Sequence, residues 1–191
     1  MPKRTLLAAA AILATPLPAF AHLNPAEHGS LLAGVSHPLT GVDHIVVMLL
    51  VGIWAATFKG PARFAIPAAF VGMMLVGFGL AMAGVALPFV EPAIIASLVA
   101  VGLLIALAVR VPALAAAAIV GVFAVFHGHA HGSELGAAGA VSYACGFAVA
   151  TAALHGAGLW LGSAAVRHAQ PMAIRAAGLF GAVAGLALFA A

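Results

Sequence analysis

Long apolar stretches with almost no charge decide what this chain can fold into. No charged side chain occurs between Phe64 and Val90, or between Leu135 and Val166. A bilayer core about 30 Å thick is spanned by about 20 helical residues, whereas an open strand would leave its backbone groups unpaired in lipid. Only 6% of the residues are charged, against about 25% in a soluble domain. The sequence therefore predicts an all-α, polytopic membrane helix bundle.

The N-terminus has the pattern of a secretory signal peptide. Lys3 and Arg4 precede an apolar run from Leu6 to Leu13, and Ala19-Phe20-Ala21 forms an A-x-A cleavage site. This pattern predicts a signal peptide over residues 1–21, cleaved before His22, and a single transmembrane domain over residues 22–191. A retained signal anchor is the alternative.

Charges and prolines divide the mature chain into six candidate spans. We predict transmembrane helices over Leu39–Phe58, Phe64–Leu87, Ala93–Val109, Ala113–Gly128, Gly136–Val166 and Met172–Ala191. The fourth is short by this count, so we expect its helix to continue through the histidines that follow. Glycines recur within the spans, as at Gly72, Gly77, Gly79 and at Gly178, Gly181, Gly185, and are expected to allow close helix–helix approach.

The basic residues indicate how the bundle is oriented. Beyond the signal they all lie in or beside the odd-numbered connections: Lys59, Arg63, Arg110, Arg167 and Arg175. The positive-inside rule places those connections in the cytoplasm. We therefore expect a multi-pass protein of the bacterial cytoplasmic (inner) membrane whose mature N- and C-termini are periplasmic. The basic residues form no patch that would suggest a nucleic-acid partner.

The first polar cluster lies in HPLTGVDH, at the start of the first span. His37 and His44 are seven positions apart, so a regular helix would place them nearly on one face, with Asp43 rotated away. Either Gly41 loosens the turn, or one of the three acts by orienting another. Ionisable side chains at membrane depth point to function, although a purely structural Asp–His pair between helices would explain them as well.

The second cluster is FHGHAHGSE, from Phe126 to Glu134. His127, His131 and Glu134 follow one another at helical spacing, which puts two imidazoles and a carboxylate on one face. Such a ligand set suits divalent nickel, cobalt, zinc or copper. His129 faces away from the three and is a candidate to line an entry path. A solvated polar loop is the plain alternative.

Together the two clusters predict a divalent-cation site between the first and fourth spans, or two sites in series. Further candidates come from elsewhere in the chain, each with a simpler reading beside it. Glu91 could add a carboxylate or be an ordinary helix-start acid. His155, deep in the fifth span, is either a further step of the route or a polar group bonded across helices, and His22 and His28 could collect metal from solvent. Because Cys145 is the only cysteine, a thiolate cluster is excluded.

These motifs resemble the HupE/UreJ family of nickel permeases, the small membrane proteins associated with hydrogenase and urease. The resemblance rests on His37-Pro38, Gly41, Asp43-His44, Met48 and Gly52-x-Trp54-Ala55-Ala56, and on Phe126-His127-Gly128-x-Ala130-His131-Gly132-x-Glu134. Thr40 stands where the family commonly has serine. The resemblance implies uptake of Ni²⁺, or of Co²⁺, for metalloenzyme maturation. It implies that His37, Asp43, His44, His131 and Glu134 matter most, with Glu91 and Phe70 as companions; from the residues alone, Phe70 is a packing side chain.

The expected function is thus a secondary transporter that takes up Ni²⁺ from the periplasm, with no prosthetic group and with the metal ion and the lipid bilayer as partners. An intramembrane zinc-dependent hydrolase could use the same His and Asp residues, with a metal-bound water as nucleophile. A metal-binding membrane protein without transport is a third alternative. A continuous polar path across the bilayer would favour the transporter, whereas a substrate-sized cleft at the metal would favour the hydrolase.

Overall fold

The described part of the computed structural model, residues 30–135 and 139–190, contains helices and no strand. The predicted signal peptide, with His22 and His28, lies outside these residues. The elements are α2 (Leu31–Ser36), the 3₁₀ turn η1 (His37–Leu39), α3 (Val42–Ala55), α4 (Ala62–Met82), α5 (Val90–Ala106), α6 (Ala113–Leu135), α7 (Ala140–Arg167) and α8 (Pro171–Phe189).

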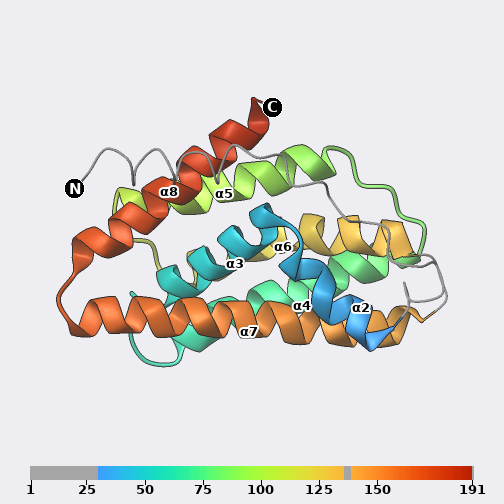
Figure 1. The fold of residues 1–191 in the computed structure, drawn as a ribbon, viewed down its shortest axis with the longest axis horizontal. Helices are drawn as coiled ribbons and strands as arrows, with labels where there is room; N and C mark the ends of the chain where they lie inside the picture. Colours follow the sequence, from blue (N-terminus) through green and yellow to red (C-terminus); the bar gives the residue numbers. More distant parts are fainter. Residues whose placement is uncertain (1–29, 136–138, 191) are drawn as a thin grey trace, which may run out of the picture.

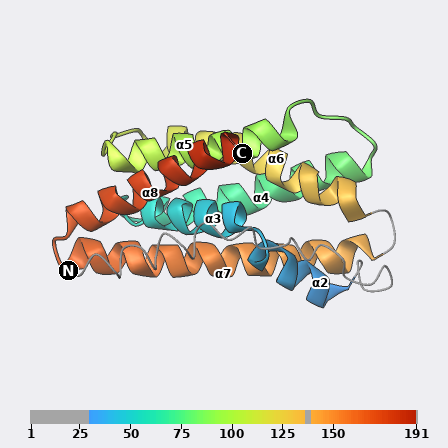
Figure 2. The same ribbon diagram turned by 45° about the horizontal axis from the view of Figure 1, so that its top comes forward.

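The helices form a bundle in which α3 is central. α3 packs against α4, α5, α7 and α8, while the most extensive pairings are α4 with α6, α5 with α8, and α3 with α7. In Figures 1 and 2 the long helix α7 runs along one side of the bundle, and the short α2 lies against its N-terminal part. Large apolar side chains such as Phe70, Met74 and Phe147 are fully buried between the helices.

Glycines bring the main pairs into backbone contact. A Cβ atom added at Gly52 of α3 would collide with the His155 carbonyl of α7, and one at Gly158 with the Leu49 carbonyl. Among the predicted packing glycines, Gly77 and those of α8 do meet neighbouring helices at this range. Gly72 and Gly79 do not, because a Cβ at either position would meet nothing within 4 Å. The prediction was therefore wrong for these two, which lie on an exposed face of α4.

Four helices, α4, α6, α7 and α8, are long and apolar enough to cross a membrane by themselves. The short helix α5, Val90–Ala106, is apolar over its 17 residues, a length at the lower end of what can span a bilayer. The predicted extension of the fourth span is confirmed, since α6 continues through the histidines to Leu135. The predicted six spans remain an expectation, because α3 with its 14 residues reaches spanning length only together with α2.

The first predicted span differs most from the structure. Instead of one helix over Leu39–Phe58, the segments Leu31–Leu39 and Val42–Ala55 meet at an angle of 84°. Gly41 is extended there, with φ −91° and ψ 119°, and forms the N-cap of α3. Before it, the backbone N–H and the hydroxyl of Thr40 both donate to the His37 carbonyl, at 3.0 and 2.7 Å. These bonds close the turn at Thr40, so the helix restarts in a new direction.

The two ends of the bundle have different chemistry. Lys59, Arg110 and Arg175 line one cavity of about 640 Å³ between the C-terminal ends of α3 and α5 and the start of α8. The cavity lies at the C-terminal end of α3, whereas Asp43 and His44 lie in its first turn, at the opposite end. Basic and histidine-rich ends are thereby separated by the length of the apolar helices.

Candidate metal-binding site

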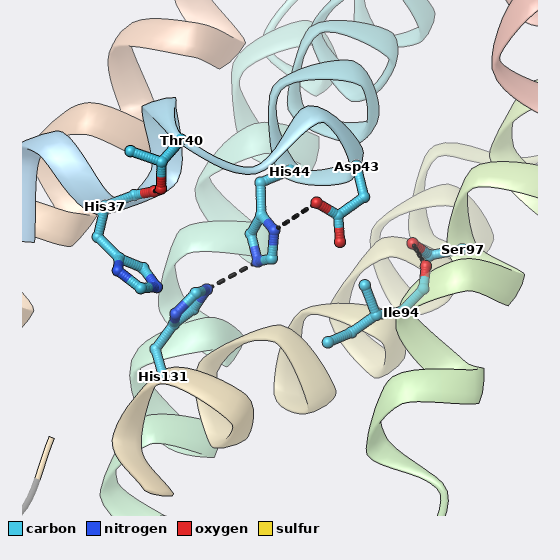
Figure 3. Close-up of polar contacts among 7 residues, drawn as sticks. All are labelled: His37, Thr40, Asp43, His44, Ile94, Ser97 and His131. Carbon is cyan, nitrogen blue, oxygen red and sulfur yellow. Dashed lines mark hydrogen bonds and ion pairs between the residues drawn. The ribbon is translucent and has the colours of Figure 1, made fainter. Parts of the chain in front are cut away.

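His44 occupies the centre of the site because the chain turns sharply just before it. The extended Gly41 starts α3, which leaves Asp43 and His44 in its first turn. The Asp43 side chain folds back onto its neighbour, so that Oδ1 lies 3.1 Å from Nδ1 of His44 (Figure 3). The predicted loosening at Gly41 is therefore seen as a break in the helix. The contact of Asp43 with His44 is compatible with the other reading, in which one residue orients another.

Helix α6 presents its histidines to the same imidazole. Nε2 of His131 lies 2.7 Å from Nε2 of His44, and the ring of His127, one turn earlier in α6, lies 5.3 Å from the His44 ring. The predicted shared face of His127 and His131 is thus confirmed as geometry. We call His37, Asp43, His44, His127 and His131 the histidine cluster.

His37 reaches the cluster from the other side of the bend. Its ring is 4.6 Å from that of His131, in an edge-to-face arrangement, and 6.0 Å from the ring of Tyr143 in α7. Figure 3 shows His37 and His44 approaching His131 from the two arms of the broken segment. The break therefore accomplishes what a regular helix would have done by periodicity: both histidines face the same partner.

The hydrogen bonds leave two buried ring nitrogens of the cluster, one in His127 and one in His131, with lone pairs available for a ligand. If Nδ1 of His44 donates to the Asp43 carboxylate, its Nε2 is an acceptor and Nε2 of His131 donates to it. Nδ1 of His127 donates to the Phe123 carbonyl at 2.9 Å, which fixes Nε2 as the bare nitrogen. Nε2 of His127 and Nδ1 of His131 are buried and have no hydrogen-bond partner among the residues that the structure describes. Neutral imidazole nitrogens of this kind are the ones that bind metal ions.

Buried aromatic side chains contact the histidines of the cluster. The Phe147 ring of α7 lies 4.3 Å from that of His131, and the Phe70 ring of α4 lies 5.5 Å from that of His127. Phe147 and Tyr143 were not predicted as part of the site. Their spacing of four residues in α7, next to the packing glycine Gly146, is the signal that could have indicated a common inward face.

The cluster is arranged for hydrogen bonding among its own members. In the described part of the chain, no three His, Cys, Asp or Glu side chains converge in a metal-binding geometry. Two nitrogens on one ion at about 2.0–2.1 Å would lie about 2.9 Å apart at a right angle and about 3.4 Å apart in a tetrahedron. The 2.7 Å between His44 and His131 is a few tenths of an ångström short of the former. A small separation of the two rings would therefore admit a cation in place of the shared proton.

The other predicted residues are not gathered here. His129 is buried on another face of α6, where its Nε2 donates to the Val85 carbonyl at 2.7 Å and so links α6 to the segment after α4. Glu91 is exposed in the first turn of α5. Glu134 lies in the last turn of α6, and its side chain is outside the described atoms. His155 is buried deeper in the bundle, against Phe70.

Comparison with known proteins agrees with the motifs that form this site. The family model described as HupE / UreJ protein matches residues 10–188. Protein HupE of Rhizobium leguminosarum bv. viciae is 44% identical over 179 residues, which cover 93% of this chain and 94% of that protein. No solved structure matches the chain. The match spans nearly the whole sequence, both clusters included, and the chain belongs to the HupE/UreJ family.

Proposed function

We propose that this protein is a permease that takes up Ni²⁺, with Co²⁺ as an alternative cargo, across the cytoplasmic membrane. The observation that carries the proposal is the meeting of His44 and His131, whose Nε2 atoms face each other at 2.7 Å inside an apolar bundle. They come from different helices, and His127 brings a third imidazole beside them. A cation bound here would offset the cost of placing so many polar groups within the bundle.

The ligand types suit an ion that must be released again. Imidazole nitrogens and carboxylate oxygens bind divalent nickel and cobalt, but without the thiolates that hold soft metals more tightly. In this scheme His37, His44, His127 and His131 supply the nitrogens. Asp43 keeps the His44 ring in place and balances its charge. Glu134 and the exposed Glu91 are carboxylates that would receive the ion from solvent.

Membership of the HupE/UreJ family supports the choice of metal. The family's association with hydrogenase and urease implies nickel as the cargo and the maturation of a nickel enzyme as its use. Imidazole and carboxylate alone would also accept copper or zinc, so selectivity must come from geometry: the small separation that His44 and His131 require, and the aromatic walls of Phe147 and Phe70 that limit it.

The proposed orientation follows from the two ends of the bundle. The bent segment α2–α3 would be the first of six spans, followed by α4, α5, α6, α7 and α8. Lys59, Arg110 and Arg175 gather at one end, which the positive-inside rule assigns to the cytoplasm. The histidine cluster then lies toward the periplasm, where a cleaved signal peptide would also leave the mature N-terminus, and the C-terminus would be periplasmic.

The hydrolase alternative has no comparable support. It needs a cleft that brings a lipid or peptide to the histidines, but both cavities described in this structure lie toward the basic end of the bundle. One is lined by Lys59 and Arg110 and the other by His168 and Gln170, and neither is lined by a member of the histidine cluster. The alternative of a binding protein without transport shares the site and differs only in flux.

The test is uptake of radiolabelled Ni²⁺ by cells that lack their own nickel transporters. The intact protein would be compared with His44→Ala and His131→Ala at equal abundance in the membrane. His168→Ala is the matched control, because His168 is exposed at the end of α7. We expect uptake by the intact protein and the control and its loss in both cluster variants. If the correctly inserted intact protein takes up neither Ni²⁺ nor Co²⁺, the proposal fails.

A further inference from the structure

His155 is buried in the middle of the bundle without an adequate partner. It is 2% exposed, and neither of its ring nitrogens makes a hydrogen bond within the described part of the chain. Its polar neighbour is the backbone carbonyl of Thr151, one turn earlier in α7. A buried polar group normally has a partner, and one that lacks it calls for a functional explanation.

The surroundings of His155 connect it with the histidine cluster. The Phe70 ring of α4 lies 4.9 Å from the His155 ring and 5.5 Å from the His127 ring, so one aromatic side chain contacts both imidazoles. One turn further along α4, the buried Met74 sulfur accepts a hydrogen bond of 3.6 Å from the Thr151 hydroxyl. A thioether and a hydroxyl thus meet one turn from the His155 imidazole, where α4 faces α7.

His155, Thr151 and Met74 lie deeper in the bundle than His44. A Cβ at Gly52 of α3 would meet the His155 carbonyl, and Gly52 is eight residues beyond His44, which corresponds to about 12 Å along the helix. On α4, Phe70 is likewise eight residues from Phe78, which stacks on Tyr143 beside His37. The backbone of His155 therefore lies about 12 Å along the bundle from His44, and its ring is linked to the cluster through Phe70, which also contacts His127.

We propose that His155 is an inner binding station for the divalent cation. The ion would reach the His155 imidazole from Nε2 of His127, the buried nitrogen that points away from the Phe123 carbonyl. The Met74 thioether and the Thr151 hydroxyl are its secondary donors. His127 is shared with the cluster, so the ion is handed from His44 and His131 to His127 and then, along the Phe70 ring, to His155. This inference rests on the proposed function and assigns the next step of the route.

A thiol placed at the station would report whether metal arrives there. Cys145 is the only cysteine and is exposed, so Cys145→Ser gives a background without thiols. In that background His155→Cys introduces a softer ligand at the same position. On binding Co²⁺ the thiol releases its proton to the buffer, and the cobalt–thiolate bond adds a charge-transfer absorption band in the near ultraviolet.

The purified protein with His155→Cys is therefore titrated with Co²⁺ alone, beside two other single-cysteine variants. Leu161→Cys lies on the exposed side of the same helix and controls for unspecific binding, while His131→Cys probes the cluster. We expect the band for His155→Cys and none for Leu161→Cys. Absence of the band for His155→Cys, or an equal band for Leu161→Cys, overturns the inner station, whatever His131→Cys shows.

Thr151→Cys guards against a variant that does not fold. It replaces a hydroxyl by a thiol of similar size one turn from His155, and we expect it to give the band as well. If His155→Cys does not fold and a monodisperse Thr151→Cys gives no band, the inner station is overturned as well.

Uptake separates this proposal from the function on which it rests. Because the cluster captures the ion first, His155→Ala should lower the maximal rate of Ni²⁺ uptake at least tenfold and change the KM for external Ni²⁺ less than twofold. A normal maximal rate in His155→Ala, with transport by the intact protein, refutes the inner station and leaves the permease standing. No transport by the intact protein refutes the permease, and the Co²⁺ band then decides separately whether His155 binds metal.

Discussion

Replacing Gly128 by alanine tests whether the close contact of α4 and α6 sets the position of the histidines. Gly128 lies between His127 and His129 in the second motif, and its added Cβ would lie 2.6 Å from the carbonyl carbon of Met74 and 2.9 Å from the nitrogen of Phe78. Both are backbone atoms of α4, so no side-chain rotation relieves the clash. Ordinary contact begins at 3.4 Å and the Met74 carbonyl oxygen is closer still than these two atoms, so α6 must move by more than about 0.8 Å.

The magnitude follows from two opposing contributions. Overpacking costs about 1–3 kcal/mol, whereas alanine in place of glycine inside a helix gains about 1 kcal/mol. We expect a net destabilisation of up to about 2 kcal/mol. The displacement also shifts His127 and His131 relative to His44, and loss of ligand geometry on this scale lowers metal affinity about 10–100-fold.

Thermal unfolding of the detergent-solubilised protein and Ni²⁺ uptake measure the two effects. Gly79→Ala is the matched control, because a Cβ at Gly79 meets nothing within 4 Å; it should leave uptake intact and keep or raise stability. If Gly128→Ala unfolds and transports like Gly79→Ala, the helices are not in the contact described and the reasoning is refuted.

Three further perturbations have definite expected outcomes. Asp43→Asn keeps an oxygen that can accept a hydrogen bond from His44 but removes the negative charge. The KM for Ni²⁺ uptake should therefore rise about 10–100-fold, with little change in membrane abundance. An unchanged KM would show that Asp43 is not part of the site. Uptake at constant Ni²⁺ should fall on acidification of the outside, because protons compete with the cation for the imidazole lone pairs. A rise in initial rates on acidification would contradict histidine ligation. His129→Ala leaves the Val85 carbonyl without its 2.7 Å hydrogen-bond partner. It should lower the free energy of unfolding by about 1–3 kcal/mol without changing the KM for Ni²⁺. An altered KM with unchanged thermal unfolding would instead show that His129 takes part in transport.

Helical periodicity predicted the site best where the chain is regular. The spacing of His127 and His131 placed both on one face of a helix that continues beyond Gly128, and both side chains do contact His44. Here the geometry within one helix was sufficient, since a spacing of four residues fixes the relative direction of two side chains.

The bend between Leu31–Leu39 and Val42–Ala55 could not be predicted from helical periodicity. Gly41 indicated a loosened turn, but the angle of 84° depends on tertiary contacts that bring α2 against α7, where Gly34 and Gly146 allow the backbones to meet. The same limit explains Gly72 and Gly79. A glycine in an apolar helix indicates that close approach is permitted, but which face carries the neighbour is decided by the packing of the whole bundle.

Ni²⁺ flux in proteoliposomes that contain only the purified protein tests directly whether this protein transports the ion. With Ni²⁺ outside and a chelating indicator inside, we expect the indicator signal to rise with time in vesicles containing the intact protein. Vesicles containing His44→Ala in equal amount should behave like protein-free ones. Binding of Ni²⁺ to the intact protein without any rise of the internal signal would contradict the account and identify a metal-binding membrane protein that does not transport.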